Sequence, residues 1–521
     1  MGHHTTEYNP FSTTGQSIDT MNAKDRSSSS FSIATFSALG LAFIAFKKWE
    51  QRRRRCRDVR DGLLADGNAS GSINNYISVR GQALLTPTQP YIMDYLKCLQ
   101  DQCDPHSNPQ GYIPLCVAEN KLIIEHFASR LMQVETAYRA FSESIVYCYN
   151  NSLGLPGTRE AVAYFLTKHF LFPEERNLSF QEALHWIRPE YIAIGSGAAS
   201  LVSHLAMSLA DPGDAVLIPA PYYAAFDADV KIFAGCVTIP VHSADPTIGP
   251  SAKDLESAAV LAEAKGLRVR ILLITNPNNP LGTIYPPTVI KSAIDWARSR
   301  SMHTIVDEVY ALGCHEELGS GFESVVRILK NDLGNDVHHL WALSKDFGAS
   351  GFRIGTLYTQ NNHLLSSLAN LNIFTSVSHP MQMILSEVLT DDNFIYQFLD
   401  NAREKIRYSY YFCTKRLDEM VIPYVNAKAG IFVYADFSAL LPSQTPEGEA
   451  QFASLLLDAA HIIMTPGQSQ KDLKPGMFRI CYCFVSLDVL EIAMNRLDRL
   501  VGKIRRWHWD NLNSDSLTDI L

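Results

Sequence analysis

The sequence lacks the cysteine and histidine patterns that build disulfide frameworks or zinc sites. Its ten cysteines include no CxxC pair and no regular framework, and its histidines form no HxxxH motif or Cys/His cluster with zinc spacing. We therefore expect reduced thiols and no metal site. Cys481 and Cys483 flank one residue, which predicts strand residues whose thiols lie on one face of a sheet.

Basic residues are also few relative to acidic ones, with 45 lysines and arginines against 54 aspartates and glutamates. The formal net charge of -9 argues against general nucleic-acid binding, so no nucleic acid is expected among the partners. No repeat architecture is evident. The 521 residues, of which 46% are hydrophobic and 19% charged, suffice for two lobes with a substantial core, which favours a large soluble α/β enzyme.

Charge is unevenly distributed near the N-terminus. Residues 31–46 carry no charge, and a basic run continues from there to residue 57. If the apolar segment inserted into an intracellular membrane, the basic run would keep the rest of the chain facing the cytosol. A helix of this length spans about 24 Å against about 30 Å of hydrocarbon, so insertion would be partial or would thin the bilayer. Residues 31–57 are thus a candidate membrane anchor, with a surface helix or an unanchored, cytosolic arm as alternatives.

One stretch pairs a potential Schiff-base amine with a phosphate-binding guanidinium. Ser344 and Lys345 follow a predicted buried strand over residues 340–343, and Arg353 comes eight residues after the lysine. A lysine at a strand end can form an imine with an aldehyde cofactor if burial and nearby cations lower its pKa. The small residues 348–351 would let the backbone approach a ring-sized ligand. The pairing indicates pyridoxal phosphate; a solvated loop lysine beside a structural arginine is the alternative.

A second strand end offers a partner for the ring nitrogen of that cofactor. Residues 304–310 comprise an apolar strand that ends in two carboxylates, and Tyr310 comes three residues after the first of them. A buried Asp307 facing the ring nitrogen would keep it protonated, and the cation would withdraw electrons from the substrate α-carbon. Tyr310 would hydrogen-bond the phenolic oxygen of the ring. A strand-end turn or helix cap is the alternative interpretation of Asp307 and Glu308.

A third strand end, after the apolar run 271–274, carries two successive Asn-Pro steps over residues 276–280. These steps make a rigid turn that would present the amide of Asn279 to the same phenolic oxygen, while Gly282 permits a strained backbone. A purely structural turn is the alternative. Helical stretches such as 290–300 alternate with these strands, which predicts a mostly parallel sheet with its ligand at the carboxyl ends of the strands.

The three motifs, NPxNPxG, DExY and SKxxGxxGxRxG in this order, resemble the class I and II aminotransferases among the fold-type I pyridoxal phosphate enzymes. The resemblance covers roughly residues 80 to 505. It implies an α/β fold of the fold-type I transferases, with a mostly parallel seven-stranded sheet in a large lobe and a smaller α+β lobe. It also implies a homodimer in which each active site borrows residues from its neighbour.

On this basis we expect seven segments. They are a disordered arm (1–30), the apolar and basic segment (31–57), a linker (58–80), a small lobe (81–119 and 371–507), a large cofactor-binding lobe (120–370) and a tail (508–521).

Within the family the chain is similar to 1-aminocyclopropane-1-carboxylate synthase-like proteins, including fungal members of secondary metabolism. Segments that carry this likeness are 118–120, 154–156, 209–214, 221–227 and 429–432. It implies that Tyr223 stacks on the cofactor ring, that Arg479 clamps the substrate α-carboxylate, and that Glu119 lies beside the departing part of the substrate. Core packing for Tyr223, a surface strand position for Arg479 and a helix cap for Glu119 are the alternatives.

Three hydroxyl groups of the synthases are replaced here. Ser152 stands where the family has a tyrosine that crosses the dimer interface, Ala199 where the synthases have threonine, and Ala342 where serine is usual. Backbone N–H groups of residues 197–200, among them those of Ala198 and Ala199, would still bind the cofactor phosphate together with Arg353 and Ser344. The changes make cyclopropane formation doubtful.

The sequence thus predicts a pyridoxal phosphate-dependent aminotransferase that acts on an α-amino acid through a lysine aldimine and a quinonoid intermediate, in secondary metabolism. Lys345 would be the base, with Asp307 and Tyr310 as the other catalytic residues. Open alternatives are a C–S lyase that acts by β or γ elimination on a cysteine-type conjugate, a 1-aminocyclopropane-1-carboxylate synthase, and a membrane-tethered scaffold without turnover.

Overall fold

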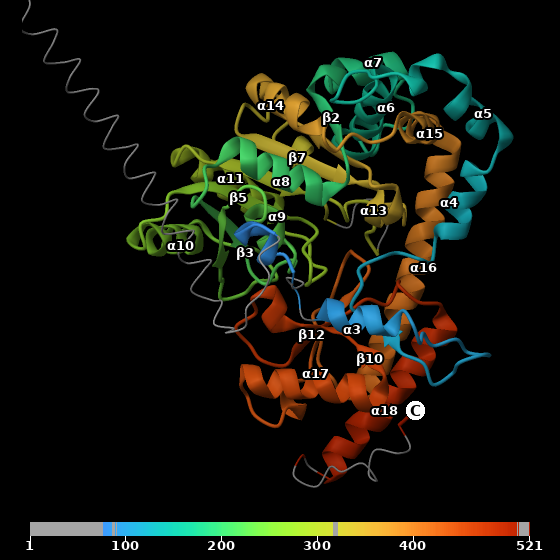
Figure 1. The fold of residues 1–521 in the computed structure, drawn as a ribbon, viewed down its shortest axis with the longest axis vertical. Coiled ribbons are helices and arrows are strands. Elements are labelled where there is room, and N and C mark those ends of the chain that lie inside the picture. Colours follow the sequence, from blue (N-terminus) through green and yellow to red (C-terminus); the bar gives the residue numbers. More distant parts are fainter. Residues whose placement is uncertain (1–76, 86–88, 90, 316–320, 508, 510–519) are drawn as a thin grey trace, which may run out of the picture. The chain divides into compact units, whose positions relative to one another are not determined.

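The computed structural model describes residues 77–85, 89, 91–315, 321–507, 509 and 520–521, all within the compact unit Ser70–Leu521 (Figure 1). The predictions for the arm, the apolar segment 31–46, the basic run and most of the linker and tail lie outside the described residues. Within these described ranges, no helix combines the length and apolar character that crossing a membrane requires.

A seven-stranded sheet forms the centre of the large lobe (Figure 1). Its order is β2-β8-β7-β6-β5-β3-β4, and every neighbouring pair is parallel except the two that involve β8. The expected α/β fold with a mostly parallel sheet is confirmed. The strands are β2 (Ile192–Gly195), β3 (Ala215–Pro219), β4 (Val237–Val241), β5 (Val269–Thr275), β6 (His303–Asp307), β7 (Val337–Ala342) and β8 (Gly355–Tyr358).

The three predicted motif strands correspond to β5, β6 and β7, which are adjacent in the sheet. Their register pairs Thr275 with Asp307 and Asp307 with Leu340. Because parallel strands end at the same edge, this register brings the three motifs together in space.

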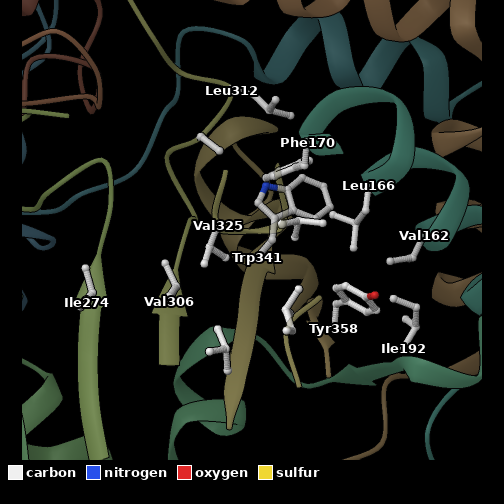
Figure 2. Close-up of a cluster of buried hydrophobic side chains, with 14 of the residues drawn as sticks. Val162, Leu166, Phe170, Ile192, Ile274, Val306, Leu312, Val325, Trp341 and Tyr358 are labelled. Carbon is white, nitrogen blue, oxygen red and sulfur yellow. The ribbon is translucent and has the colours of Figure 1, made fainter. Parts of the chain in front are cut away.

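Residues on both faces of the inner strands are buried, which explains the apolar runs in β3, β5 and β6. On β5, Leu272 and Ile274 pack into one core, whereas Ile271 and Leu273 pack into another on the opposite face. Figure 2 shows the first core around Trp341 of β7, which is fully buried. The large lobe is therefore a helix–sheet–helix sandwich that holds the strand ends rigidly.

Some of the helices that surround the sheet begin at a capping residue or a proline of the sequence. Ser251 and Asp254 form a reciprocal capping box at the start of α10, and Pro287 occupies the first turn of α11, which overlaps the predicted helix at 290–300. These helices are α4 (Ile124–Leu131), α5 (Val134–Ser142), α6 (Pro156–Leu166), α7 (Phe180–Trp186), α8 (Ala198–Leu209), α9 (Phe226–Lys231), α10 (Ala252–Ala264), α11 (Pro287–Ser299), α12 (Val325–Ile328), α13 (Leu343–Asp346), α14 (Asn362–Asn372) and α15 (His379–Leu389).

The smaller lobe combines residues from both ends of the described chain. β1 (Ile113–Pro114) pairs in parallel with β10 (Ile462–Ile463), and β11 (Thr465–Pro466), β12 (Met477–Ile480) and β9 (Val433–Asp436) form an antiparallel sheet. The helices are α3 (Tyr91–Cys98), α16 (Asp392–Glu419), α17 (Pro446–Ala460) and α18 (Leu487–Trp507). The short helix α2 (Val79–Gln82) precedes them in the chain and buries none of its residues. This lobe has the α+β character that was expected.

One long helix, α16, contributes to both lobes. Its Phe398 and Ala402 pack into the core beside the large sheet, whereas Ile406 and Leu417 pack into the core of the small lobe. The division into lobes at residue 370 remains a prediction. The packing nevertheless places α15 and the first half of α16 with the large-lobe core.

The predicted strand over Cys481 and Cys483 is wrong. β12 ends at Ile480, and the three following residues form a buried turn. The backbone N–H of Cys481 donates to the Leu115 carbonyl, and the carbonyl of Cys483 accepts from the Lys121 N–H. These bonds to the chain between residues 115 and 121 replace the bonds that a continued strand would make.

Candidate active site

A cavity of about 130 Å³ lies at the carboxyl ends of β5, β6 and β7. Nine of the residues that the sequence predicts to bind the cofactor line it. These residues are Ala198, Ala199, Tyr223, Asn279, Asp307, Tyr310, Ser344, Lys345 and Arg353. A larger cavity of about 440 Å³ lies between α3 and α17, but it is lined by carboxylates and by no lysine or arginine, so it does not suit a phosphate.

Lys345 enters the smaller cavity from α13, the short helix that follows β7. Its Nζ donates a hydrogen bond of 2.5 Å to the carbonyl oxygen of Ala118. Burial, and next the charge of Arg479, lower the pKa of Lys345 to about 8. The amine is therefore partly free of its proton near neutral pH, as imine formation requires.

Asp307 is the last residue of β6 and only 5% of it is exposed. Its Oδ1 accepts one hydrogen bond, of 3.3 Å, from the Val309 N–H. Burial raises the pKa of the Asp307 carboxyl to about 7, while that hydrogen bond and the Lys345 charge act in the opposite direction. A buried carboxyl that accepts only this one hydrogen bond among the described residues fits a cationic partner inside the cavity, such as a protonated ring nitrogen.

Glu308, next to Asp307, has a structural role instead. It is fully buried, its Oε1 accepts from the Val325 N–H at 2.6 Å, and its Oε2 contacts Nε2 of His339 at 3.0 Å. Glu308 thus fits the alternative interpretation of this carboxylate pair as a structural cap. Asp307 also accepts from the Val309 N–H, as in a strand-end turn, but it lines the cavity, and its role at the ring nitrogen remains a prediction.

A hydrogen-bonded chain connects three of the predicted residues. Arg479 donates from Nη1 to Oδ1 of Asn279 at 2.9 Å, and Nδ2 of Asn279 donates to the hydroxyl of Tyr310 at 3.4 Å. The two strand-end motifs and the predicted carboxylate clamp thus form one connected unit, although Arg479 comes from the small lobe.

The Arg479 guanidinium is buried without a carboxylate. Only 2% of the residue is exposed, and no ion pair to it exists among the described residues. Nη2 donates to the Cys116 carbonyl at 2.6 Å and to Oγ1 of Thr465 at 3.2 Å, and the guanidinium lies 5.3 Å from the ring centre of Phe432. A buried cation without an anion fits an incoming carboxylate.

The phosphate end of the cavity is built from backbone as well as side chains. Gly197 caps α8 with φ of +84°, and a Cβ added there would lie 2.6 Å from Nη2 of Arg353. Arg353 therefore packs directly against the first turn of α8, whose N–H groups have no partner within the helix. This guanidinium and the helix N-terminus together fit a phosphate dianion, with the Ser344 hydroxyl in the same cavity.

The two residues predicted to bind the substrate, Arg479 and Glu119, lie outside the cavity lining. Glu119 accepts a hydrogen bond of 2.5 Å at Oε1 from the hydroxyl of Ser350, which does line the cavity. Tyr223 lies in the lining and packs edge to face on Phe226, with ring centres 5.3 Å apart. The roles that the resemblance implies for these three residues remain predictions.

The replaced hydroxyl positions have clear local environments. Ser152 donates from Oγ to the Ala369 carbonyl at 2.6 Å, so its hydroxyl is bound within its own chain. Ala199 and Ala342 both line the cavity, and neither adds a polar side chain to it. The prediction that backbone N–H groups, Arg353 and Ser344 hold the phosphate therefore remains a prediction.

Sequence reasoning missed Asp229, Thr275 and Ser350, which also line the cavity. Thr275 could have been noticed, because it ends a predicted strand directly before the Asn-Pro steps. Asp229 gave no signal, since its place beside the cavity depends on how α9 packs.

Comparison with known proteins agrees with this geometry. Residues 115–497 match the family model described as aminotransferase class I and II. The chain belongs to this family. It is 32% identical over 460 residues to 1-aminocyclopropane-1-carboxylate synthase 6 of Oryza sativa subsp. japonica, covering 85% of this chain and 81% of that protein. It is 31% identical to 1-aminocyclopropane-1-carboxylate synthase 7 of Arabidopsis thaliana, covering 80% of this chain and 93% of the relative.

Solved aminotransferase structures share the fold. The aspartate aminotransferase of Thermus thermophilus with maleate aligns with a TM-score of 0.66 at 23% identity, over 81% of this chain and 99% of that one. The aromatic aminotransferase of Pyrococcus horikoshii aligns with a TM-score of 0.63 at 20% identity, over 76% and 96%. This member of the class I and II aminotransferase family is thus a pyridoxal phosphate-dependent enzyme with the fold-type I architecture.

Proposed function

We propose that this family member is an aminotransferase that acts on an α-amino acid. The observation that carries the proposal is the Arg479 guanidinium, buried without a carboxylate and close enough to Lys345 to lower its pKa. Two parallel hydrogen bonds from a planar guanidinium would hold an α-carboxylate and fix the substrate's orientation.

In this proposal the residues of the cavity have separate roles. Lys345 takes and returns the substrate α-proton at Nζ, which its lowered pKa permits near neutral pH. Pyridoxal phosphate, when bound, withdraws electrons from the α-carbon. Asp307 would hold the ring nitrogen, Asn279 and Tyr310 the phenolic oxygen, and Arg353 with the start of α8 the phosphate.

A second candidate is a reaction in which a β or γ substituent of the amino acid leaves. The similarity to 1-aminocyclopropane-1-carboxylate synthases favours it, as does the position of Glu119 one hydrogen bond from the cavity. C–S elimination from a cysteine-type conjugate and ring closure to the cyclopropane both belong to this class. Ser152, bound to the Ala369 carbonyl, replaces the family's interface tyrosine and disfavours ring closure.

The absorption spectrum of the purified holoprotein separates the two candidates. Single amino acids and cysteine S-conjugates are added without any oxo acid, and the visible cofactor band is followed. Lasting conversion to pyridoxamine phosphate supports amino transfer. Return of the starting spectrum after product has formed would contradict it and support elimination or ring closure.

We also propose a homodimer, the usual state of this family. Large apolar side chains are exposed on α5 and just after it, among them Tyr138, Phe141 and Tyr147, at 70%, 56% and 73%. Burial of such a patch is a common driving force for association. Sedimentation analysis tests this: a fully active monomer would contradict it.

Residues 31–46 and the basic run after them motivate a further proposal, that the enzyme is attached to an intracellular membrane and faces the cytosol. Fractionation of cells that express the full chain, or the chain without residues 31–57, tests it. Equal partition of both forms into the soluble fraction would contradict attachment. The place in secondary metabolism rests on resemblance and remains a prediction.

A further inference from the structure

Two polar side chains in the cofactor cavity lack hydrogen-bond partners. Oδ2 of Asp229 and Oγ1 of Thr275 are buried, and neither has a partner anywhere in the described part of the chain. Both residues line the cavity, Asp229 from α9 and Thr275 from the end of β5. Buried polar atoms are rarely left unpaired in folded proteins, so unpaired oxygens facing a cavity indicate a group that binds there.

Both residues lie close to Asp307. Thr275 and Asp307 are register partners on the adjacent parallel strands β5 and β6, so their side chains project from the same face of the sheet. Burial, and next the charge of Asp307, raise the pKa of the Asp229 carboxyl to about 7. The end of the cavity that holds Asp307 therefore contains two carboxyls and a free hydroxyl.

Few charges from the surrounding elements act on Asp229. Neither α8 nor β4, the elements that pack against α9, contains a lysine or arginine. From α8, Ser203 donates to the backbone carbonyl of Asp229 at 2.6 Å, and burial lowers the pKa of His204, which favours its neutral form. His242 follows β4, and burial likewise lowers its pKa.

On the cavity side, Asp229 faces Asp307 and Tyr223, and burial followed by the Asp229 charge raises the pKa of the Tyr223 hydroxyl. The other charged groups of α9 are Asp227 and Lys231. Asp227 is engaged elsewhere, because it accepts from the hydroxyls of Tyr222 and Thr238 and pairs with a lysine of the small lobe.

We propose that Asp229 and Thr275 are positioning residues that complete, with Asp307, a polar cluster for the cationic ring end of the cofactor. Two neighbouring carboxyls cannot both ionise cheaply in a buried site unless a cation lies between or beside them. The cluster therefore binds either a proton or a cation. The Thr275 hydroxyl can donate to an ionised carboxylate at the same end.

This role goes beyond the proposed amino transfer, since it concerns the cofactor before any substrate is present. It would hold equally for an eliminating enzyme. The cofactor band of the resting holoprotein can therefore test it without a reaction.

The experiment is a pH titration of the visible cofactor band in the full-length holoprotein, together with the Kd of pyridoxal phosphate. Removal of a negative charge from the cavity lowers the pKa of a cationic group of the cofactor bound there. D229N is therefore expected to shift the midpoint of the cofactor-band titration down by about 0.5–1 pH unit. The Kd should rise about threefold to tenfold. D229E keeps the charge and should keep the midpoint.

Two further variants make the test specific. D227N changes the neighbouring carboxylate of the same helix, which points to Tyr222 and Thr238, so it should alter stability but not the midpoint. T275V should raise the Kd, whereas T275S, which keeps the hydroxyl, should not.

An unchanged midpoint in D229N, or an equal shift in D227N, would overturn the role of Asp229. An unchanged Kd in T275V would overturn that of Thr275. If D229N does not fold, D229E is compared with the wild type instead. An unchanged midpoint in D229E would support a role that depends on the charge, and a midpoint displaced by more than about 0.5 pH unit would contradict it.

Discussion

Arg479 and Asn279 are joined by a hydrogen bond of 2.9 Å although they lie 200 residues apart in the chain. Arg479 belongs to β12 of the small lobe, and Asn279 belongs to the loop after β5 in the large lobe. Through Asn279 the guanidinium is also connected to Tyr310. A substrate carboxylate bound to Arg479 would thus be connected by hydrogen bonds to Asn279 and Tyr310, which line the cofactor cavity.

Replacement of this guanidinium should weaken substrate binding more than folding. Loss of a charge-assisted, bidentate contact is expected to lower kcat/KM by about 10²-fold in Arg479→Leu, mostly through KM. Steady-state kinetics with the best amino-acid substrate would measure this.

Arg496 offers a matched control, because it is also fully buried and donates to the carbonyls of Gly111, Ala460 and Pro109. Arg496→Leu should cost about 3 kcal/mol of stability and leave the KM of the folded enzyme unchanged. A similar KM in the Arg479 variant and the wild type would refute the clamp.

Lys345→Ala should abolish the visible band of the lysine-bound cofactor and lower turnover by at least about 10³-fold, because both the imine and the base are lost. The fold should persist, since the variant removes an amine whose pKa burial has already lowered to about 8. Absorbance and circular dichroism of the same sample test both statements. Persistence of the band would mean that another amine holds the cofactor.

The site could be predicted from the sequence largely because its residues occupy short motifs at strand ends. Asn279, Asp307 and Lys345 each follow an apolar run, and parallel strands bring such ends to one edge. Arg479 could be assigned only through the family resemblance, because nothing in its local sequence shows which lobe it faces.

Features that depend on tertiary packing were not predictable in this way. Asp229 reaches the cavity because α9 packs near β4 and α8, and the sequence of α9 does not encode that contact. The turn at Cys481 forms because its backbone bonds to Leu115, far away in the chain. A local alternation of residues cannot reveal either arrangement.

Asp307→Asn should make the stability of the cofactor-free protein less sensitive to pH. The folded-state pKa of Asp307 is raised from 3.8 to about 7, so the folded protein retains a proton that the unfolded chain loses between these values. Wild-type stability should therefore fall as pH rises from about 4 to 7. The variant lacks this loss and should be more stable than the wild type at pH 8, by about 2–4 kcal/mol.

Denaturant unfolding of both cofactor-free proteins at about pH 3 and about pH 8 would measure the difference. It should be near zero at the lower pH, where the Asp307 carboxyl is protonated in most folded and most unfolded molecules. The affinity for the cofactor should fall in Asp307→Asn although the cofactor-free protein becomes more stable, because Asn cannot neutralise a cationic ring. Equal stability at pH 8 would show that Asp307 is ionised at little cost.

Gly197 is expected to be required for cofactor binding rather than for the turn alone. It has φ of +84°, and a Cβ there would lie 2.6 Å from Nη2 of Arg353, so Gly197→Ala should displace the phosphate-binding guanidinium. Gly213 is a matched control, because its φ of +88° imposes the same backbone strain while an added Cβ would meet nothing within 4 Å. Both variants should lose about 1 kcal/mol of stability. Only Gly197→Ala should also raise the Kd of pyridoxal phosphate, by about tenfold or more, since a charge-assisted contact is weakened. Equal affinities in the two variants would show that Arg353 does not depend on the space that Gly197 leaves open.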